Sequence, residues 1–487
     1  MEWIVIILYS LSLLYIFLFS LGQLHLTWVY LRFKKSEQKV STGAEFLPMV
    51  TVQLPVFNEK YVVERLLDAV SKFDYPKDKL EIQVLDDSTD ETTSIVIRKI
   101  ESLRPLGLDI QLIHRENRTG YKAGALDQGT RLAKGEFIAI FDADFLPKPS
   151  FLKDTLSEFR NPKVGVVQTR WGHINKDYSI LTQLQAFGLN AHFSIEQSAR
   201  GYANSFINFN GTCGVWRKEC IEDAGGWKFD TLTEDLDLSY RAQLNGWKFK
   251  YLEEVETPGE LPVIMSAIKS QQYRWNKGGA ETAKKVFGQV LRAPLSLTNK
   301  IHAFFHLFNS SVFVCLLIAS ILSIPMLYIK QVHPSVSWVF DMGVVFIFGF
   351  LSITIFYWVA AKQIDRETYS KSFIALYPRF LIISMGLSLH NGIAVFEGLI
   401  GRKSPFVRTP KFNVTLKGDS WRNNSYIKLN VGGLTIVEGL LCIYFLVGIV
   451  AGIYWNDFAL IFFHVMLSLG FGAVFYYSVK PVVDAKA

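Results

Sequence analysis

The sequence predicts two joined fold classes, a doubly wound α/β domain and a helical membrane domain. Half of the 487 residues are hydrophobic, and the mean hydropathy of +0.21 is high for a soluble protein of ordinary charge. Long apolar stretches lie near both ends of the chain, whereas residues 40–260 have an ordinary globular composition. In that part strand-like and helix-like segments alternate, which is typical of a parallel sheet covered by helices.

The first membrane helix is predicted within residues 1–35. No charged side chain occurs from Ile4 to Leu31, a stretch longer than the roughly 20 residues that cross a bilayer. Arg32, Lys34 and Lys35 follow, and basic residues mark the cytoplasmic end of a membrane helix. We therefore expect the start of the chain outside and the next domain in the cytoplasm, at an inner or plasma membrane.

Four more membrane helices are predicted in the second half of the chain. Apolar stretches there are long enough to cross a bilayer. Two are expected within 301–361 and two within 434–480, at about 302–329, 337–360, 434–455 and 458–479. The four cysteines are divided between these segments and the globular part, so no disulfide framework is indicated.

Other segments are expected to lie along the membrane surface. The stretch 373–400 is apolar but contains Arg379 and Glu397, so we interpret it as an interfacial helix, and we expect further interfacial helices at 261–300. If 373–400 does not cross, the loop 401–433 is cytoplasmic. Its seven Lys or Arg and one Asp fit that side of the membrane.

The globular part, residues 45–260, has polar residues where its predicted strands end. The strand-like segments are MVTVQLPVF, LEIQVLDD, LDIQLIHR and EFIAIFDAD, and they recur about every 30 residues with helical patterns between them. Parallel strands place their carboxyl ends at one edge of the sheet, where such domains bind ligands. The polar residues at that edge are Asn58, Glu59, Asp86, Asp87, Asp142 and Asp144, with Lys122 at the start of the third helix.

Asp142 and Asp144 lie two residues apart in FDADFLPKPS, directly after a buried strand. Like charges this close repel, and burial makes each harder to ionise, so a cation between them would stabilise the pair. With Lys122 nearby, this edge suits a nucleotide whose phosphates are bridged by Mg²⁺ or Mn²⁺. The alternative is a pair of turn-forming Asp residues before Pro147. Neither a Walker glycine loop nor GxGxxG follows the first strand, which disfavours an ATPase or a dehydrogenase.

The order of seven motifs resembles the membrane-embedded family 2 glycosyltransferases, most closely the cellulose-synthase-like mannan and glucan synthases. These motifs lie within 50–290 and read LPVFNE, VLDDSTDET, RTGYKAGAL, FDADF, FNGTCGVWR, TEDLDLSYRAQLNGW and QQYRW. The resemblance implies a cytoplasmic GT-A-type (Rossmann-like) domain beside the transmembrane and interfacial helices. It also implies an inverting, metal-dependent and processive enzyme that polymerises and exports a β-linked polysaccharide.

The TED motif contains the expected catalytic residues. In the family its Asp is the general base, which implies that Asp235, with Glu234 beside it, accepts the proton of the acceptor hydroxyl. The alternative is a helix start, with Thr233 as its cap and Glu234, Asp235 and Asp237 near its positive end.

The expected nucleotide-sugar site uses the strand-end residues. Asp86 or Asp87 can accept hydrogen bonds from a nucleobase or ribose, and the sequence leaves the choice between them open. Their alternative role is to cap the following helix. Glu59 and Asp142 belong to the same set, and the resemblance assigns Lys122 to the diphosphate. The alternative for Lys122 is a solvated helix lysine.

QQYRW places Gln271, Arg274 and Trp275 on one face of a helix. The glutamine and arginine suit the nucleotide sugar, whereas the tryptophan ring suits an acceptor sugar. The alternative is an ordinary interfacial helix with an aromatic anchor. The resemblance also places Cys213 of FNGTCGVWR at the acceptor terminus, for which simple burial is the alternative.

The motif FVRTPK resembles the gating loop FxVTxK of cellulose synthases. It keeps Phe406, Thr409 and Lys411 but has Arg408 where the family usually has valine. The resemblance implies closure over bound nucleotide, and contact with anionic lipid is the alternative.

The expected partners follow from these sites. We expect a nucleotide-sugar donor, UDP-glucose with GDP-mannose as the alternative, a growing polysaccharide and the bilayer. The net charge of +7 is explained by the basic cytoplasmic loops, so no nucleic acid is expected. The rival functions are a non-processive transferase acting on a lipid acceptor and a non-catalytic nucleotide-sensing channel.

Overall fold

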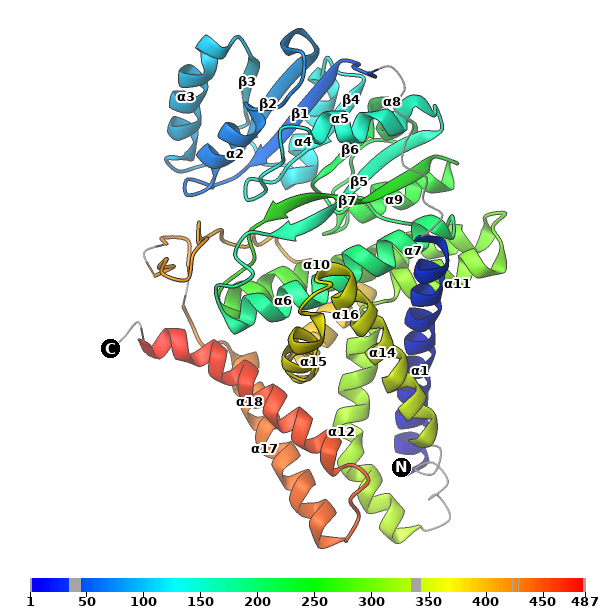
Figure 1. The fold of residues 1–487 in the computed structure, drawn as a ribbon. Coiled ribbons are helices and arrows are strands. Elements are labelled where there is room, and N and C mark those ends of the chain that lie inside the picture. The colour runs from blue at the N-terminus through cyan, green and yellow to red at the C-terminus, as the bar shows by residue number, and fades with distance from the viewer. Residues whose placement is uncertain (1, 35–44, 334–342, 423, 428, 485–487) are drawn as a thin grey trace.

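A computed structural model describes residues 2–34, 45–333, 343–422, 424–427 and 429–484. An α/β domain lies above a layer of helices, and long apolar helices extend below that layer (Figure 1). This arrangement confirms the predicted fold class.

The α/β domain is built on one seven-stranded sheet with the strand order β3-β2-β1-β4-β6-β5-β7. The strands are β1 Val50–Val56, β2 Leu80–Asp86, β3 Asp109–His114, β4 Phe137–Ile140, β5 Val164–His173, β6 Gly214–Arg217 and β7 Lys248–Gly259. β1 pairs in parallel with β2 and β4, and β2 with β3, as expected.

The sheet is mixed rather than wholly parallel, because β6 runs antiparallel to both β4 and β5. Gly214 at the start of β6 pairs with Ile140 at the end of β4. The chain therefore enters β6 from the carboxyl-end edge, and the segment just before β6 lies where the site is expected.

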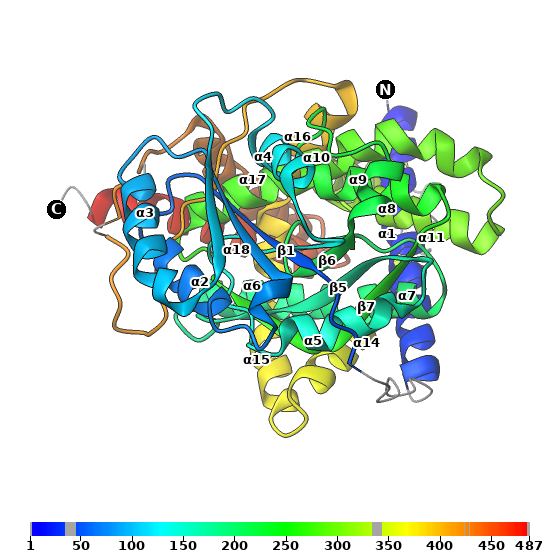
Figure 2. The same cartoon turned by 90° about the horizontal axis from the view of Figure 1, so that it is seen from above.

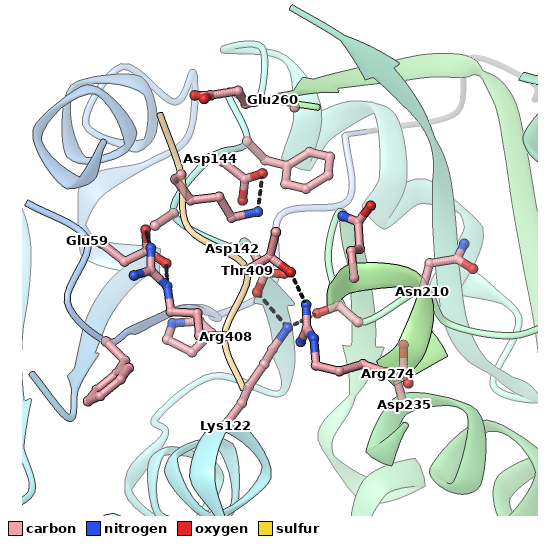
Figure 3. Close-up of a pocket in the computed structure, with 18 of the residues that line it drawn as sticks. Glu59, Lys122, Asp142, Asp144, Asn210, Asp235, Glu260, Arg274, Arg408 and Thr409 are labelled. Atoms are coloured by element: carbon pink, nitrogen blue, oxygen red, sulfur yellow. Dashed lines mark hydrogen bonds and ion pairs between the residues drawn. The ribbon is translucent and has the colours of Figure 1, made fainter. Parts of the chain in front are cut away.

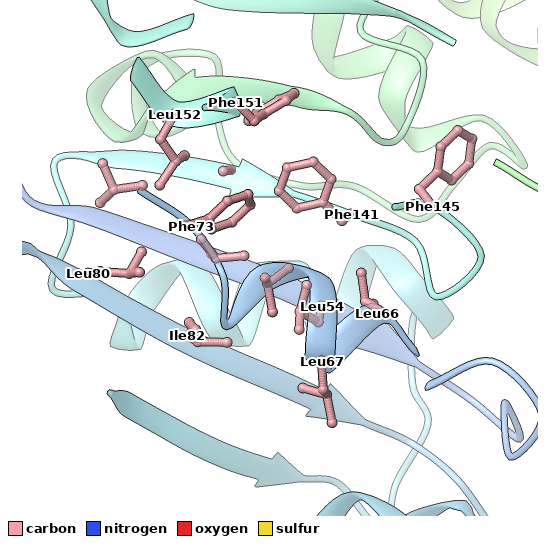
Figure 4. Close-up of a cluster of buried hydrophobic side chains, with 14 of the residues drawn as sticks. Leu54, Leu66, Leu67, Phe73, Leu80, Ile82, Phe141, Phe145, Phe151 and Leu152 are labelled. Carbon is pink, nitrogen blue, oxygen red and sulfur yellow. The ribbon is translucent and has the colours of Figure 1, made fainter. Parts of the chain in front are cut away.

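Helices cover both faces of the sheet, so the central strands β1, β2 and β4 are buried along almost their whole length. One face packs against α2 Val63–Val70, α3 Thr92–Leu103 and α5 Phe151–Leu156. Figure 4 shows this cluster, in which Leu66 and Leu67 of α2 face Leu54 and Ile82 of the sheet. The other face packs against α4 Tyr121–Leu132, α8 Lys218–Asp223 and α9 Glu234–Leu244.

A layer of helices separates this domain from the apolar helices below (Figure 1). It contains α6 Ile180–Ala191, α10 Met265–Arg292, α15 Tyr369–Gly386 and α16 Ser388–Ile400. A π-helical segment, His192–Glu196, joins α6 to α7, Gln197–Tyr202. The single interfacial helix expected at 373–400 is instead two helices, α15 and α16, bent by 51°. The break follows Gly386, whose backbone packs directly on Gly470.

Within the described residues, five helices are long and apolar enough to cross a membrane, or up to six if α15 and α16 form one broken crossing. They are α1 Glu2–Phe33, α12 Ser311–Val332, α14 Gly343–Ile364, α17 Gly433–Tyr454 and α18 Ile461–Asp484. The membrane helix predicted to start at about 302 is α12, and it starts at Ser311 instead. The residues before it form a separate helix, α11 Leu297–Leu307, which packs on α10. The start predicted at 337 lies outside the described residues.

Residues 401–432 connect α16 to α17, and this segment is called the 401–432 loop below. It lies at the side of the domain that carries α2 and α3, as Figures 1 and 2 show. The ring hydroxyl of Tyr426 donates to Asp90 just before α3, which ties the loop to the α/β domain.

Candidate active site

A pocket of about 170 Å³ opens at the carboxyl-end edge of the sheet, between the α/β domain, α10 and the 401–432 loop. Figure 3 shows charged side chains from all three parts pointing into it. Most of the sequence-predicted site residues line this pocket, namely Glu59, Asp87, Lys122, Asp142, Asp144, Glu234, Asp235, Gln271, Arg274, Trp275, Phe406, Thr409 and Lys411. Asp86 and Cys213 do not line it.

Asp86 has a structural role at the end of β2. Its fully buried carboxylate accepts hydrogen bonds from the Ser88 backbone N–H (3.0 Å) and the Thr93 hydroxyl (2.6 Å). Asp87 instead lines the pocket, where both its oxygens pair with Arg115 at 2.7 and 2.5 Å. The geometry therefore favours Asp87 for contact with a ligand.

Cys213 lies in the core behind the pocket. Its side chain is fully buried, and burial raises the pKa of the thiol well above its ordinary value. The preceding Thr212 hydroxyl accepts a hydrogen bond from the Asp142 backbone N–H at 2.9 Å, which supports the strand end from behind. The members of FNGTCGVWR that reach the pocket are Asn210 and Gly211.

Each Asp of FDADF is paired with a lysine. Lys122 Nζ lies 2.5 Å from Asp142 Oδ1, and Lys411 Nζ lies 2.6 Å from Asp144 Oδ2. The other oxygen of Asp144, Oδ1, is buried and has no hydrogen-bond partner among the described residues. A buried carboxylate oxygen without a partner is costly unless a ligand meets it.

These two carboxylates fit a divalent cation that takes further ligands from its substrate. The described part of the chain holds no cluster of three or more His, Cys, Asp or Glu that would cage a metal alone. Mg²⁺ sites commonly use one or two carboxylates and complete their coordination with phosphate oxygens and water. Asp142 and Asp144 offer that incomplete set at the pocket wall.

Asp235 lies in the first turn of α9. Burial and then the neighbouring Glu234 charge raise the pKa of Asp235 to about 7, and Lys122 opposes this shift. Burial also raises the pKa of Glu234, against the effect of Lys122. The alternative role of Thr233 as a helix cap is not observed, because its side chain makes no capping hydrogen bond. Asp237 is turned away from the pocket and pairs with Arg241 and Lys285.

Helix α10 brings the QQYRW side chains to the opposite wall. Arg274 donates to the Thr409 hydroxyl at 2.9 Å, and its guanidinium lies 4.8 Å from the centre of the Phe406 ring. Burial lowers the pKa of Arg274, against the effects of Glu234 and other carboxylates, but arginine stays charged at neutral pH. Its Nε is buried without a hydrogen-bond partner in the described chain.

The 401–432 loop enters the pocket through the FVRTPK motif. Phe406 stacks on Tyr121 with 5.4 Å between ring centres. Arg408 pairs with Glu59, with 2.7 Å between Arg408 Nε and Glu59 Oε1. Burial raises the pKa of Glu59 to about 7, although Arg408 and Lys411 oppose the shift. In this arrangement the motif faces the α/β domain rather than lipid.

Sequence reasoning missed several residues of the pocket wall. Arg118 belongs to RTGYKAGAL and Asn210 to FNGTCGVWR, so these two motifs could have indicated both residues as part of the pocket. Trp171 and His173 end β5 and Glu260 follows β7, where no charge cluster or spacing singles them out.

A second cavity, of about 920 Å³, lies below the pocket among the apolar helices. Gln271 and Trp275 of α10 line both spaces. Most of its lining is apolar, but Gln185, Gln272 and Asn276 also line it. The two cavities therefore share part of the QQYRW helix as a common wall.

Residues 48–278 match the family described as "Glycosyltransferase like family 2". Glucomannan 4-beta-mannosyltransferase 1 of Oryza sativa subsp. japonica is 34% identical over 400 residues, which are 79% of this chain and 73% of that protein. Glucomannan 4-beta-mannosyltransferase 7 of Arabidopsis thaliana is 41% identical over 269 residues, 54% of this chain. That alignment spans only 48% of the Arabidopsis protein.

A solved structure shares the fold. The mannosyltransferase PcManGT from Pyrobaculum calidifontis, solved in complex with GDP-Man and Mn²⁺, aligns with a TM-score of 0.56 and 21% identity. The alignment covers 81% of this chain and 100% of that chain.

Proposed function

Because this chain belongs to the family 2 glycosyltransferases, in their cellulose-synthase-like branch, we propose that it transfers mannose from GDP-mannose to a growing β-linked polysaccharide. Two relatives are named glucomannan 4-beta-mannosyltransferases, and the solved structure of similar fold contains GDP-Man. These comparisons give no support to UDP-glucose, the donor expected from the sequence, so GDP-mannose replaces it.

One observation carries the proposal. Asp142, Asp235 and Arg274 come from three distant parts of the chain and line one pocket, with Lys122 between the two aspartates. Glycosyl transfer from a nucleotide sugar requires positive groups for the diphosphate and a base for the acceptor hydroxyl. The pocket contains both.

The acceptor reacts at Asp235. A carboxylate with a raised pKa is a stronger base, so Asp235 is suited to accept a hydroxyl proton near neutral pH. As the proton moves to Asp235, the acceptor oxygen forms a bond to the anomeric carbon from the face opposite the diphosphate. The bond from that carbon to the diphosphate oxygen breaks, and the diphosphate takes the electron pair. Attack from the opposite face inverts the anomeric configuration.

Charge on the leaving diphosphate is met by Arg274 and Lys122. Arg274 lies near Glu234 and Asp142, and its Nε has no hydrogen-bond partner among the described residues. Lys122 Nζ donates to Asp142 Oδ1 at 2.5 Å and to the Gly211 carbonyl at 2.8 Å. Asp142 and Asp144 would hold Mg²⁺ or Mn²⁺, which would supply further positive charge to the diphosphate. Lys411 pairs with Asp144 Oδ2 in this structure, and Asp144 Oδ1, without a hydrogen-bond partner among the described residues, would be the oxygen available to a cation.

We also propose that the enzyme adds sugars repeatedly and exports the growing polymer. Trp275 lines both the pocket and the cavity below, so an acceptor sugar stacked on this ring would have its older units in the cavity. The basic 401–432 loop and the basic residues after the first membrane helix support a cytoplasmic α/β domain. The mostly apolar cavity lining favours a second candidate, transfer of one sugar to a lipid acceptor.

The test uses purified full-length protein in lipid nanodiscs. It is incubated with GDP-mannose, UDP-glucose or other nucleotide sugars, each with Mn²⁺, with Mg²⁺ or with EDTA. We expect a mannose polymer from GDP-mannose with either metal, and none with EDTA. Product size and linkage then separate a polymer from a singly glycosylated lipid. Nucleotide binding without donor consumption would contradict the proposed enzyme.

A further inference from the structure

Arg408 is a charged residue of the pocket wall that has no role in the proposed reaction so far. It stands in FVRTPK at the position where FxVTxK has valine. Its side chain is 15% exposed and lines the pocket. A guanidinium has five N–H donors, and those that the protein does not use are available to a ligand.

Two acceptors at the end of β1 hold the guanidinium of Arg408. Its Nε donates to Glu59 Oε1 at 2.7 Å, and its Nη2 pairs with the other oxygen of the same carboxylate. Its Nη1 donates to the backbone carbonyl of Asn58 at 2.5 Å. The Asn58 backbone N–H in turn donates to the Ser88 hydroxyl at 2.8 Å, which fixes this turn to the end of β2. The guanidinium is therefore held in a defined position.

These contacts use three of the five N–H groups of Arg408. One N–H remains on Nη1 and one on Nη2, and neither nitrogen meets a second acceptor in the described part of the chain. Two N–H groups on neighbouring nitrogens suit a ligand that presents two acceptors side by side.

The nucleoside of a bound donor would extend toward Arg408. Figure 3 shows Glu59 and Arg408 on one side of Asp142, and Arg274 and Asp235 on the other. In the proposed reaction the sugar lies at Asp235 and the diphosphate lies near Asp142. The nucleoside is joined to the opposite end of the diphosphate, so it lies on the side of the pocket that holds Arg408.

The edges of the nucleobases differ in what they offer to two parallel N–H groups. Guanine presents two acceptors side by side, O6 and N7. Adenine places an amino donor next to N7, and a uracil ring presents only the O4 acceptor on the corresponding edge. An arginine with two free N–H groups therefore favours guanine over both.

We propose that Arg408 binds the guanine base of the donor, by donating its two remaining N–H groups to O6 and N7 while Glu59 and Asn58 hold it in place. The inference rests on the proposed function and adds the residue that selects the nucleotide. If Arg408 only tied the 401–432 loop to the α/β domain, its loss would weaken all nucleotides alike.

The test measures nucleotide affinities by calorimetry, with full-length protein in nanodiscs and Mn²⁺. The probes are GDP, UDP and 7-deaza-GDP, in which a C–H group replaces N7. One lost hydrogen bond to a charged group changes affinity about tenfold. We expect wild type to bind GDP about tenfold more tightly than 7-deaza-GDP, and to bind UDP more weakly than GDP by a similar factor or more.

Two substitutions of Arg408 separate base recognition from loop attachment. Arg408→Lys keeps a positive charge for Glu59 but cannot donate two parallel N–H groups, and Arg408→Val removes both charge and donors. We expect GDP affinity to fall at least tenfold in both variants, and the preference for GDP over 7-deaza-GDP to shrink to about onefold. Unfolding temperatures within a few degrees of wild type would show that the variants are folded.

Arg422→Lys is the matched control, because Arg422 belongs to the same loop and its side chain is 63% exposed. It should leave all three affinities unchanged. An equal loss for GDP, UDP and 7-deaza-GDP in the Arg408 variants would overturn the inference, as would a wild-type protein that binds GDP and 7-deaza-GDP equally. A wild-type protein that prefers GDP but never consumes GDP-mannose would refute the proposed function and leave the role of Arg408 standing.

Discussion

Lys411 Nζ lies 2.6 Å from Asp144 Oδ2, although 267 residues separate them in the chain. The lysine belongs to the 401–432 loop, and the aspartate lies just after strand β4. The contact places a protein cation at a carboxylate that, in the proposed reaction, faces a divalent metal. We therefore expect the loop lysine and the proposed metal to compete for Asp144.

Replacing this lysine tests the competition. Lys411→Met removes the ammonium group but keeps most of the apolar side chain, so Asp144 should bind Mn²⁺ more readily. We expect the affinity for Mn²⁺ without nucleotide, measured by electron paramagnetic resonance, to rise several-fold, while turnover falls. Lys417→Met, an exposed lysine of the same loop, is the control. An unchanged Mn²⁺ affinity in Lys411→Met would show that the two cations do not compete for Asp144.

Asp235→Asn tests the proposed base. The amide keeps the shape of the side chain but cannot accept the proton, and general-base catalysis contributes about 10²–10⁴-fold to a rate. We expect transfer to fall by at least a hundredfold while the dissociation constant for GDP, measured by calorimetry, stays within about twofold. The exposed Asp177→Asn is the matched control. Appreciable transfer by Asp235→Asn would place the base elsewhere.

The pH dependence follows from the same carboxyl. Asp235 must be ionised to act as a base, so activity is lost as pH falls through its pKa. Burial and Glu234 raise that pKa to about 7, so kcat/KM should rise with pH near neutrality rather than near pH 4. Glu234→Gln removes the neighbouring charge and should move this rise to lower pH. A rise that stays in place or moves upward in Glu234→Gln would contradict the coupling.

A buried ion pair between α10 and α17 yields a stability prediction. Lys269 Nζ lies 2.6 Å from Glu438 Oε2 and also donates to Ser478 of α18 at 2.9 Å, and both charged residues are buried. Removing one partner leaves a buried charge, which typically costs about 3–5 kcal/mol. We expect Lys269→Met to lower the unfolding temperature in detergent markedly.

The double substitution provides the check. Lys269→Met with Glu438→Leu removes both charges and should recover most of the lost stability, since a buried pair and an apolar pair are often equally stable. If the double variant is as unstable as the sum of the single variants, the pair does not act as a unit.

The sequence predicted the parts of the site that short motifs and strand ends identify. Asp142 and Asp144 carry charge where an apolar strand ends, so their position at the ligand-binding edge followed from the topology of a βαβ sheet, whereas Asp235 was assigned by the resemblance of its TED motif. The choice between Asp86 and Asp87 could not be predicted, because neighbouring residues at a strand end point in opposite directions. Only the structure shows that Asp87 faces the pocket.

Other features depend on contacts that one sequence does not display. The role of Arg408 depends on Glu59, 349 residues away in the chain. The reversal of β6 and the break between α15 and α16 likewise come from tertiary packing, which outweighs local pattern. Cys213 looked like a pocket residue because it belongs to a pocket motif, yet it is buried in the core.

We propose that carboxylates from the end of the sheet hold a metal-bound nucleotide sugar in this pocket. Calorimetric titration of GDP into the full-length protein in nanodiscs tests it most directly, with Mn²⁺ or with EDTA, and with wild type or Asp142→Asn/Asp144→Asn. We expect wild type to bind GDP with Mn²⁺, and GDP binding to be at least tenfold weaker with EDTA or in the double variant. Equal GDP affinity under all these conditions would contradict it.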